Sequence, residues 1–240
     1  MSGKVLNFVG LVSQFMGNAT IPRVLIDTAQ VPGDSVELRL VQRGDDFMIV
    51  LDRNELMSSR MSASEEALAD LGCAHLTGRK GARVLIGGLG MGFTLRRALK
   101  ILPADAEVVV AELVPKIVEW ARGPLAHIFD GCLDDPRVRI AVGDVAWAIE
   151  DGGWDAILLD VDNGPDGLTH AGNDKLYSVR GLQVTKRALR SGGVLAIWSA
   201  YADAAFTKRL KDCGYLVDEQ VVRARRTKGA RHVIWLAGRR

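Results

Sequence analysis

A glycine-rich stretch at residues 82–99 constrains the fold of this chain more than any other part of the sequence. A short apolar run at 84–86 is followed by four glycines in six positions, and then by a segment in which apolar and basic residues alternate at helical spacing. This order predicts a strand, a tight turn and a helix. Such a turn lets backbone N–H groups approach a ligand closely and directs a helix N-terminus toward it.

Downstream of this stretch, apolar strands alternate with helices. The predicted strands are residues 84–86, 107–111, 138–141, 156–159 and 194–197, with helices at 95–101, 115–126, 145–149 and 177–189. Connections of crossover length between apolar strands are typical of a parallel sheet covered on both faces. A helix at 204–213 and a hairpin of strands at 216–222 and 232–237 end the chain. The predicted fold class is α/β, a Rossmann-like, mostly parallel seven-stranded sheet with an antiparallel hairpin, as in class I methyltransferase-like domains.

The first part of the chain has a different pattern. Strands at 23–26, 36–41 and 47–51, separated by turns at 32–34 and 44–46, predict a small antiparallel sheet, and a short helix is expected at 5–16. Ser62 and Glu65 have the spacing of a capping box, which predicts the start of the next helix. We therefore divide the chain into a small N-terminal β-rich domain, residues 1–61, and a Rossmann-like ligand-binding domain, residues 62–240.

The composition limits the possible partners. The formal net charge is only +2, from 31 basic and 29 acidic residues, which gives no electrostatic case for nucleic acid. The apolar run at 5–16 is too short and too polar to span a membrane, and no signal-peptide cleavage pattern follows it. The three cysteines and four histidines lack metal-ligand spacing. We expect a cytoplasmic protein with reduced thiols, no metal, and neither a nucleic-acid nor a membrane partner.

Three acidic residues, Glu112, Asp144 and Asp160, follow the second, third and fourth predicted strands. Ligands of open α/β sheets bind outside the carboxyl ends of such strands. Glu112 lies 20 residues after Gly92, where a carboxylate can accept hydrogen bonds from both hydroxyls of a ribose. Structural roles are the alternatives: Glu112 as an exposed strand-end acid, Asp144 as a helix N-cap, and Asp160 as a turn former.

The glycine spacing separates two classes of cofactor. Gly88, Gly90 and Gly92 form G-x-G-x-G, whereas a dinucleotide site prefers G-x-G-x-x-G and would need a glycine where Phe93 stands. The spacing therefore favours a nucleoside-sulfonium ligand and disfavours an NAD-dependent oxidoreductase. Close packing of the helix on the sheet is the structural alternative for these glycines.

From about residue 36 to residue 195 the chain resembles the spermidine synthase group of polyamine aminopropyltransferases, which use this fold. The matching segments are 51–52, 64–66, 84–96, 143–144, 154–160, 176–177, 187–189 and 192–195, together with Glu112. The resemblance implies that Glu112 holds the ribose, that Asp144 recognises the adenine amino group, and that Asp160 orients and deprotonates an attacking amine.

Further site residues complete the prediction. Asp162 is a second candidate for the base. The expected cofactor site also contains Gly88, Gly90, Met91, Gly92, Leu113, Val145 and Asp160. The expected acceptor site contains Asn163, Tyr177 and Trp198, with a core role as the alternative for Tyr177.

The chain departs from the family pattern at three positions, two of which usually carry an acid. Met91 stands where the family usually has an acid that contacts the amino group of the transferred chain, Asn163 stands where a second acid follows Asp160, and Leu56 replaces a typical glutamine. An acid at position 91 would attract the ammonium of decarboxylated S-adenosylmethionine and repel the carboxylate of ordinary S-adenosylmethionine. Met91 therefore favours the ordinary donor.

These arguments predict a transferase that moves an alkyl group from S-adenosylmethionine to a small-molecule acceptor, with an amine among the acceptors considered. Methyl transfer is placed ahead of aminopropyl transfer from decarboxylated S-adenosylmethionine, because of the departures at the acids. A non-catalytic nucleoside-binding or scaffold protein is the second alternative. The sequence leaves a homodimer open.

Overall fold

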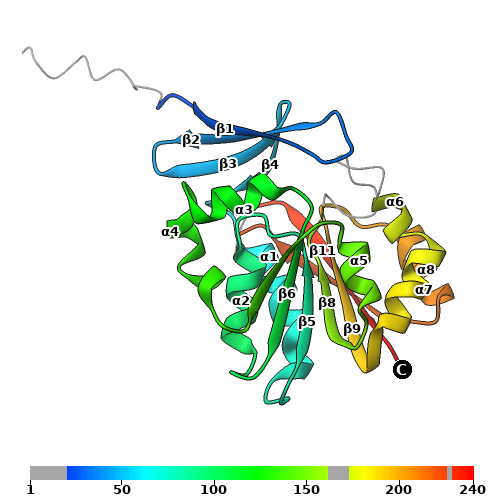
Figure 1. The fold of residues 1–240 in the computed structure, drawn as a ribbon. Helices are drawn as coiled ribbons and strands as arrows, with labels where there is room; N and C mark the ends of the chain where they lie inside the picture. The colour runs from blue at the N-terminus through cyan, green and yellow to red at the C-terminus, as the bar shows by residue number, and fades with distance from the viewer. Residues whose placement is uncertain (1–20, 162–172, 226–228) are drawn as a thin grey trace, which may run out of the picture.

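Two β-sheets, one small and one large, form the frame of the protein (Figure 1). The computed structural model describes residues 21–161, 173–225 and 229–240, so the helix expected at 5–16 lies outside the described residues. No helix within these three ranges has the length and apolar character needed to cross a membrane.

The small sheet is an antiparallel meander of four strands in sequence order. Its strands are β1 (Val24–Gln30), β2 (Glu37–Arg43), β3 (Asp46–Leu51) and β4 (Asn54–Ser58). Leu38 pairs with Leu51 and Leu40 with Ile49, and these four side chains are buried on one face, as the alternation of a strand predicts. The fourth strand was not predicted, because Asn54–Ser58 has no apolar alternation long enough to indicate one.

The large sheet has the strand order β10-β11-β9-β8-β5-β6-β7, and it confirms the predicted fold class. The strands β5, β6, β7, β8 and β9 pair in parallel, whereas β9, β11 and β10 pair antiparallel. Their bounds are β5 (Arg83–Gly87), β6 (Glu107–Glu112), β7 (Val138–Val142), β8 (Trp154–Leu159), β9 (Leu189–Ser199), β10 (Leu216–Arg223) and β11 (Arg231–Gly238).

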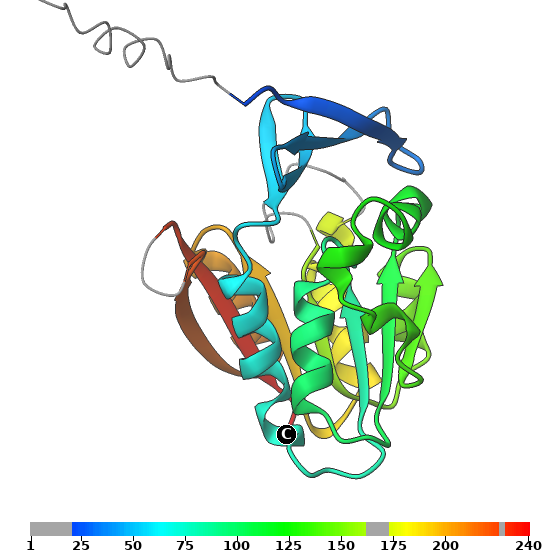
Figure 2. The same ribbon diagram turned by 90° about the vertical axis from the view of Figure 1, so that its left-hand side faces the viewer.

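Helices cover both faces of the large sheet. On one face α1 (Ala63–Cys73), α2 (Phe93–Ile101) and α3 (Pro115–Arg122) bury Val84 and Ile86; Figure 2 shows α1 and α2 side by side in front of the sheet. On the other face α5 (Val145–Glu150), α7 (Val179–Ala188) and α8 (Ala204–Asp212) bury Leu85. The alternation of these three neighbouring residues between two cores is the period-2 pattern of a strand buried on both sides.

Two predicted helices differ in detail. The helix expected at 115–126 is divided into α3 and α4 (Ala126–Phe129), because Gly123 and Pro124 interrupt it. The helix expected at 177–189 is α7, which follows a short α6 (Asn173–Leu176). Two 3₁₀ turns, η1 (Ala74–Leu76) and η2 (Cys132–Asp134), complete the described elements.

The capping box predicted for α1 was wrong. Ser62 does occupy the N-cap position, but its side chain caps no backbone N–H. Its hydroxyl instead donates a hydrogen bond of 3.0 Å to the carboxylate of Glu66. Glu65 therefore has no part in the predicted capping box.

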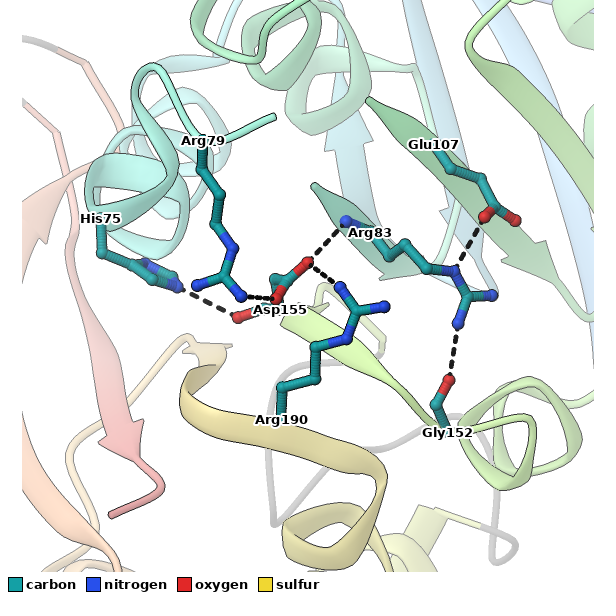
Figure 3. A network of polar contacts seen from close by, with 7 residues as sticks. All are labelled: His75, Arg79, Arg83, Glu107, Gly152, Asp155 and Arg190. Atoms are coloured by element: carbon teal, nitrogen blue, oxygen red, sulfur yellow. Dashed lines mark hydrogen bonds and ion pairs between the residues drawn. The ribbon is translucent and has the colours of Figure 1, made fainter. Parts of the chain in front are cut away.

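A buried carboxylate anchors the amino end of β8 (Figure 3). Asp155 is 1% exposed; one oxygen lies 2.7 Å from Arg79, and the other accepts hydrogen bonds from Arg190 at 2.8 Å and from the backbone N–H of Arg83 at 2.9 Å. Its backbone carbonyl lies 3.0 Å from Nε2 of His75. The network ties η1 and the loop that follows it to β5, β8 and β9, at the end of the sheet opposite to Asp160.

The small sheet is fixed over the large domain through α3, which lies directly beneath it (Figure 1). The indole N–H of Trp120 donates a hydrogen bond of 2.9 Å to Asp27, and Lys116 forms an ion pair of 3.3 Å with the same carboxylate. The ring of Phe47 also packs against that of His127, with centroids 5.4 Å apart. These contacts place the small sheet next to the carboxyl ends of β5, β6 and β8.

Candidate functional site

A cavity of about 180 Å³ lies between the two sheets. From the small sheet and the segments next to it, its wall takes Val31, Leu38, Ile49, Leu56 and Met57. From the large domain, the wall takes strand-end and helix-start residues, namely Glu65, Gly88, Gly90, Ala111, Glu112, Leu113, Val114, Ile117, Gly143, Asp144, Val145, Asp160, Val161 and Trp198. The carboxyl ends of the parallel strands thus face a largely apolar cover.

Three glycines of the loop lie close to neighbouring atoms. Gly88 has φ +92°, and a Cβ there would lie 2.4 Å from the backbone oxygen of Asp160. A Cβ at Gly90 would meet the sulfur of Met57 at 2.6 Å, and one at Gly92 would meet the ring of Phe129 at 2.5 Å. These close approaches join the loop to the end of β8, to the small sheet and to α4, and they do not test the alternative of helix packing on the sheet. Gly88 and Gly90 also line the cavity.

Glu112 ends β6 and holds the glycine loop in place. It is 5% exposed; Oε2 accepts a hydrogen bond of 2.8 Å from the backbone N–H of Leu89, and Oε1 accepts one of 2.9 Å from that of Val114. Burial raises the pKa of Glu112, and these backbone hydrogen bonds oppose the rise. The carboxylate lines the cavity in a fixed orientation, so the position agrees with the ribose-binding role that remains a prediction.

Asp144 follows β7 and caps α5. Its Oδ1 accepts a hydrogen bond of 2.8 Å from the backbone N–H of Ala146, as the structural alternative expects. Asp144 and its neighbour Val145 also line the cavity, so capping and ligand contact are compatible.

Asp160 follows β8 and is a buried carboxyl group of the cavity wall. Thr94 Oγ1 lies 3.0 Å from its Oδ2. Burial, with a smaller contribution from the negative charge of Glu65, raises the pKa of Asp160 to about 7. A carboxyl group with this pKa can take up and release a proton near neutral pH.

Glu65, at the start of α1, is the acidic wall residue that the sequence analysis missed. It lines the cavity, and Ser64 Oγ donates a hydrogen bond of 2.7 Å to its Oε2. Burial raises the pKa of Glu65, with a further contribution from the charge of Glu66. Its spacing from Ser62 indicated a helix cap, and no local pattern distinguishes a capping glutamate from one that turns into a cavity.

The remaining predicted residues divide into four groups. Trp198 and Leu113 line the cavity as predicted. Met91 and Tyr177 do not: their side chains are 0% and 1% exposed and belong to the two hydrophobic cores. Gly92 is outside the wall but sets the start of α2. Asp162 and Asn163 lie outside the described residues, so their predicted roles stay predictions.

No family model matches this chain, but individual known proteins do. A polyamine aminopropyltransferase from Mycobacterium tuberculosis (strain CDC 1551 / Oshkosh) is 30% identical over 167 residues, which are 67% of this chain and 30% of that protein. Polyamine aminopropyltransferase 1 from Hyperthermus butylicus is 34% identical over 118 residues, 47% of this chain and 39% of that protein. The chain thus spans about a third of the length of these curated relatives.

Solved structures share the fold. A spermidine synthase in complex with the transition state analogue AdoDATO is 19% identical, with a TM-score of 0.70, and a spermidine synthase from Thermotoga maritima is 20% identical, with the same TM-score. Each comparison covers 90% of this chain and 72% of the solved chain. The curated sequences therefore support the resemblance that the glycine loop and the strand-end acids indicated, and the solved structures support the predicted fold.

Proposed function

We propose that this spermidine synthase-like chain is an aminopropyltransferase, which moves the aminopropyl group of decarboxylated S-adenosylmethionine to an amine. The observation that carries the proposal is Asp160, a carboxyl group with a pKa of about 7 in the wall of a cavity where Glu112 and Asp144 also project from strand ends. The relatives named as polyamine aminopropyltransferases support the same choice.

The roles of the wall residues follow from their positions. Glu112 would bind the ribose hydroxyls of the donor, since its two oxygens are held by backbone N–H groups and keep further lone pairs. Asp144 would accept a hydrogen bond from the adenine amino group with the lone pairs left by its cap. The apolar wall from the small sheet excludes water from the reacting atoms.

The chemistry is an in-line displacement. The lone pair of a neutral amine nitrogen forms a bond to the methylene carbon next to the sulfonium, while the bond from that carbon to sulfur breaks and its electron pair stays on sulfur. The nitrogen of the product is then a positively charged ammonium, and the Asp160 carboxylate accepts one of its protons. The enzyme contributes mainly alignment of nucleophile and carbon, to which a base with a suitable pKa is added.

Methyl transfer, which the sequence placed first, has no support in the relatives named above. The argument for it depended on a neutral Met91 beside the donor. The Met91 side chain is fully buried in the hydrophobic core and is not in the cavity wall, so its lack of charge says little about the donor.

Incubation of the purified chain with decarboxylated S-adenosylmethionine and a panel of amines tests the proposal. Mass spectrometry should detect methylthioadenosine and an amine that is heavier by one aminopropyl group. A methylated acceptor formed from ordinary S-adenosylmethionine would contradict it and restore methyl transfer. Binding of nucleoside without any product would favour the non-catalytic alternative.

Asp160→Asn should lower kcat by about 10²- to 10⁴-fold, the range expected for loss of a general base. The affinity for methylthioadenosine should change little, because the nucleoside contacts assigned to Glu112 and Asp144 remain. Asp212→Asn, at an exposed ion pair on α8, is the matched control and should retain full activity. Full activity of Asp160→Asn at pH 7 would exclude Asp160 as the base.

A further inference from the structure

The charge of the cavity wall is one-sided. Four wall residues are acids, namely Glu65, Glu112, Asp144 and Asp160, and among the described residues no Lys, Arg or His lines the cavity. Negative charge in a partly enclosed site without a counter-ion attracts cations more strongly than the same charge in bulk water. The cavity therefore suits a positively charged ligand.

Two of the four acids already have backbone partners. Glu112 accepts hydrogen bonds from two backbone N–H groups, and Asp144 accepts one from Ala146. Hydrogen bonds from backbone N–H groups to a carboxylate are charge-assisted and stabilise the negative charge. These two acids are thus partly compensated by the protein itself.

Asp160 and Glu65 are compensated much less. Asp160 has the hydroxyl of Thr94, and Glu65 has the hydroxyl of Ser64 and its own backbone N–H. No basic side chain within the described ranges acts on either carboxyl group, and the charge of Glu65 acts unfavourably on Asp160. Two carboxylates in this situation lack a cation.

Thr94, in the first turn of α2, fixes the pair. Its Oγ1 lies 3.0 Å from Oδ2 of Asp160 and 3.3 Å from the backbone oxygen of Glu65. The start of α1, the start of α2 and the end of β8 are therefore joined at one hydroxyl group. Because secondary-structure elements hold both acids, the arrangement is preorganised for a ligand.

Trp198 gives a separate indication of a ligand in the same wall. Its side chain is 9% exposed, and its indole N–H has no hydrogen-bond partner among the described residues. Buried indole N–H groups usually have a partner, so an acceptor on a bound molecule would satisfy this one. The indole ring can also attract a cation through its π-face.

We propose that Glu65 and Asp160 together bind one primary alkylammonium group, and that Glu65 thereby supplies the acid that is absent at Met91. The inference rests on the proposed function, since the ammonium belongs either to the aminopropyl chain of the donor or to the amine acceptor. An ammonium group brings one positive charge and three N–H donors, which match two carboxylates with free lone pairs. The carboxylate of ordinary S-adenosylmethionine is repelled by the same pair, so Glu65 is a specificity-determining residue for the decarboxylated donor.

Glu65→Gln tests the inference, because it removes the charge and keeps the shape. The matched control is Glu66→Gln: this neighbour is on the same turn, is outside the cavity wall, and has its carboxylate bonded to Ser62. Isothermal titration measures three ligands on wild type and on both variants: decarboxylated S-adenosylmethionine, ordinary S-adenosylmethionine, and 1,4-diaminobutane alone. Thermal denaturation verifies that each variant is folded.

Wild type should prefer the decarboxylated donor by at least 10-fold, and Glu65→Gln should lose most of this preference if the ammonium is that of the donor. If it is that of the acceptor, Glu65→Gln should instead weaken 1,4-diaminobutane at least 10-fold. Glu66→Gln should stay within two-fold of wild type for every ligand. Either loss in Glu65→Gln supports the proposal and identifies the source of the ammonium.

The proposal is overturned if Glu65→Gln changes both the preference between the two donors and the affinity for 1,4-diaminobutane by less than two-fold. It is also overturned if Glu66→Gln causes losses equal to those of Glu65→Gln. Methylthioadenosine, an uncharged nucleoside, separates this failure from that of the proposed function. If wild type neither binds this nucleoside nor turns over the donor, aminopropyl transfer is contradicted, while the diamine arm still decides whether Glu65 binds an ammonium group.

Discussion

Gly88 carries two separate constraints at one position. Its φ of +92° strains any residue with a side chain, and a Cβ would lie 2.4 Å from the backbone oxygen of Asp160. A Cβ added at Gly33, with φ +79°, would meet nothing within 4 Å. Comparison of these two positions separates backbone strain from the close approach of the loop to the end of β8.

Gly33→Ala should lower the free energy of unfolding by about 1 kcal/mol, the cost of a left-handed backbone conformation for alanine. Gly88→Ala should cost about 1–3 kcal/mol more, since the contact is with backbone that cannot rotate away. It should also reduce nucleoside affinity, because Asp160 or the loop must shift. Chemical denaturation and nucleoside titration measure both effects; equal stability losses in the two variants would refute the steric argument.

The sequence identified single site residues where they directly follow a predicted strand, because the end of the strand fixes their position. Glu112, Asp144 and Asp160 each follow a predicted strand, and the cavity contains all three. Glu65 was missed because its neighbours on the chain favoured a local role, whereas its actual partner, Asp160, is 95 residues away in the sequence. Spacing within a helix does not carry this information.

The element β8 has a carboxylate at each end with a different role. Asp155, at the amino end, forms ion pairs with Arg79 and Arg190 and accepts a hydrogen bond from the backbone N–H of Arg83 (Figure 3). Asp160, beyond the carboxyl end, faces a cavity wall without described cations. The first residue stabilises the fold, and the second is available for chemistry.

Asp155→Asn should lower the free energy of unfolding by about 2–3 kcal/mol, because a buried, charge-assisted network loses its acceptor. The arginines are partly exposed, so they regain water and the cost stays below that of a fully buried pair. Ligand affinity should be unchanged in the protein that remains folded. Urea denaturation measures the stability; a loss under 0.5 kcal/mol, the range of ordinary surface variants such as Asp212→Asn, would contradict the anchoring role.

The sequence predicted those helices and strands whose apolar residues follow a regular pattern. Strands buried on both faces, such as β5 and β6, stand out as apolar runs. By contrast β4 forms because β3 offers it an edge, which is a tertiary cause.

At the scale of the whole molecule, the carboxylate pair makes stability depend on pH. The folded protein raises the pKa of Asp160 from an ordinary value of 3.8 to about 7, so between these values the folded state holds a proton that the unfolded state has released. The stabilisation from this group is complete below about pH 3.8 and is lost as pH rises through about 7. The raised pKa of Glu65 acts in the same direction.

Asp160→Asn should remove this dependence. We expect the stability of the variant relative to wild type to increase from pH 4 to pH 8, because only wild type loses the protonated carboxyl group. Differences in urea midpoint at several pH values isolate this contribution from acids with lowered pKa values, such as Asp27 and Asp135. A difference that is constant with pH would show that Asp160 does not titrate in this window.

The cavity could not be derived from the sequence, although both of its halves could. The meander predicted at 23–51 and the parallel sheet were each visible in the alternation of apolar residues. Which face of the small sheet would cover the strand ends depends on long-range contacts, such as that between Asp27 and Trp120. These partners are 93 residues apart and carry no sequence pattern.

Because the cavity lies between the two sheets, a ligand bound in it affects how stably the sheets are held together. Direct polar contacts between the small sheet and the large domain, such as the hydrogen bond from Trp120 on α3 to Asp27, are partly exposed to solvent. A molecule that fills the cavity touches both sheets at once, and at a concentration 100 times its Kd it adds about 2.7 kcal/mol to the docked arrangement. A ligand bound in the cavity should therefore stabilise the docking of the small sheet on the large one.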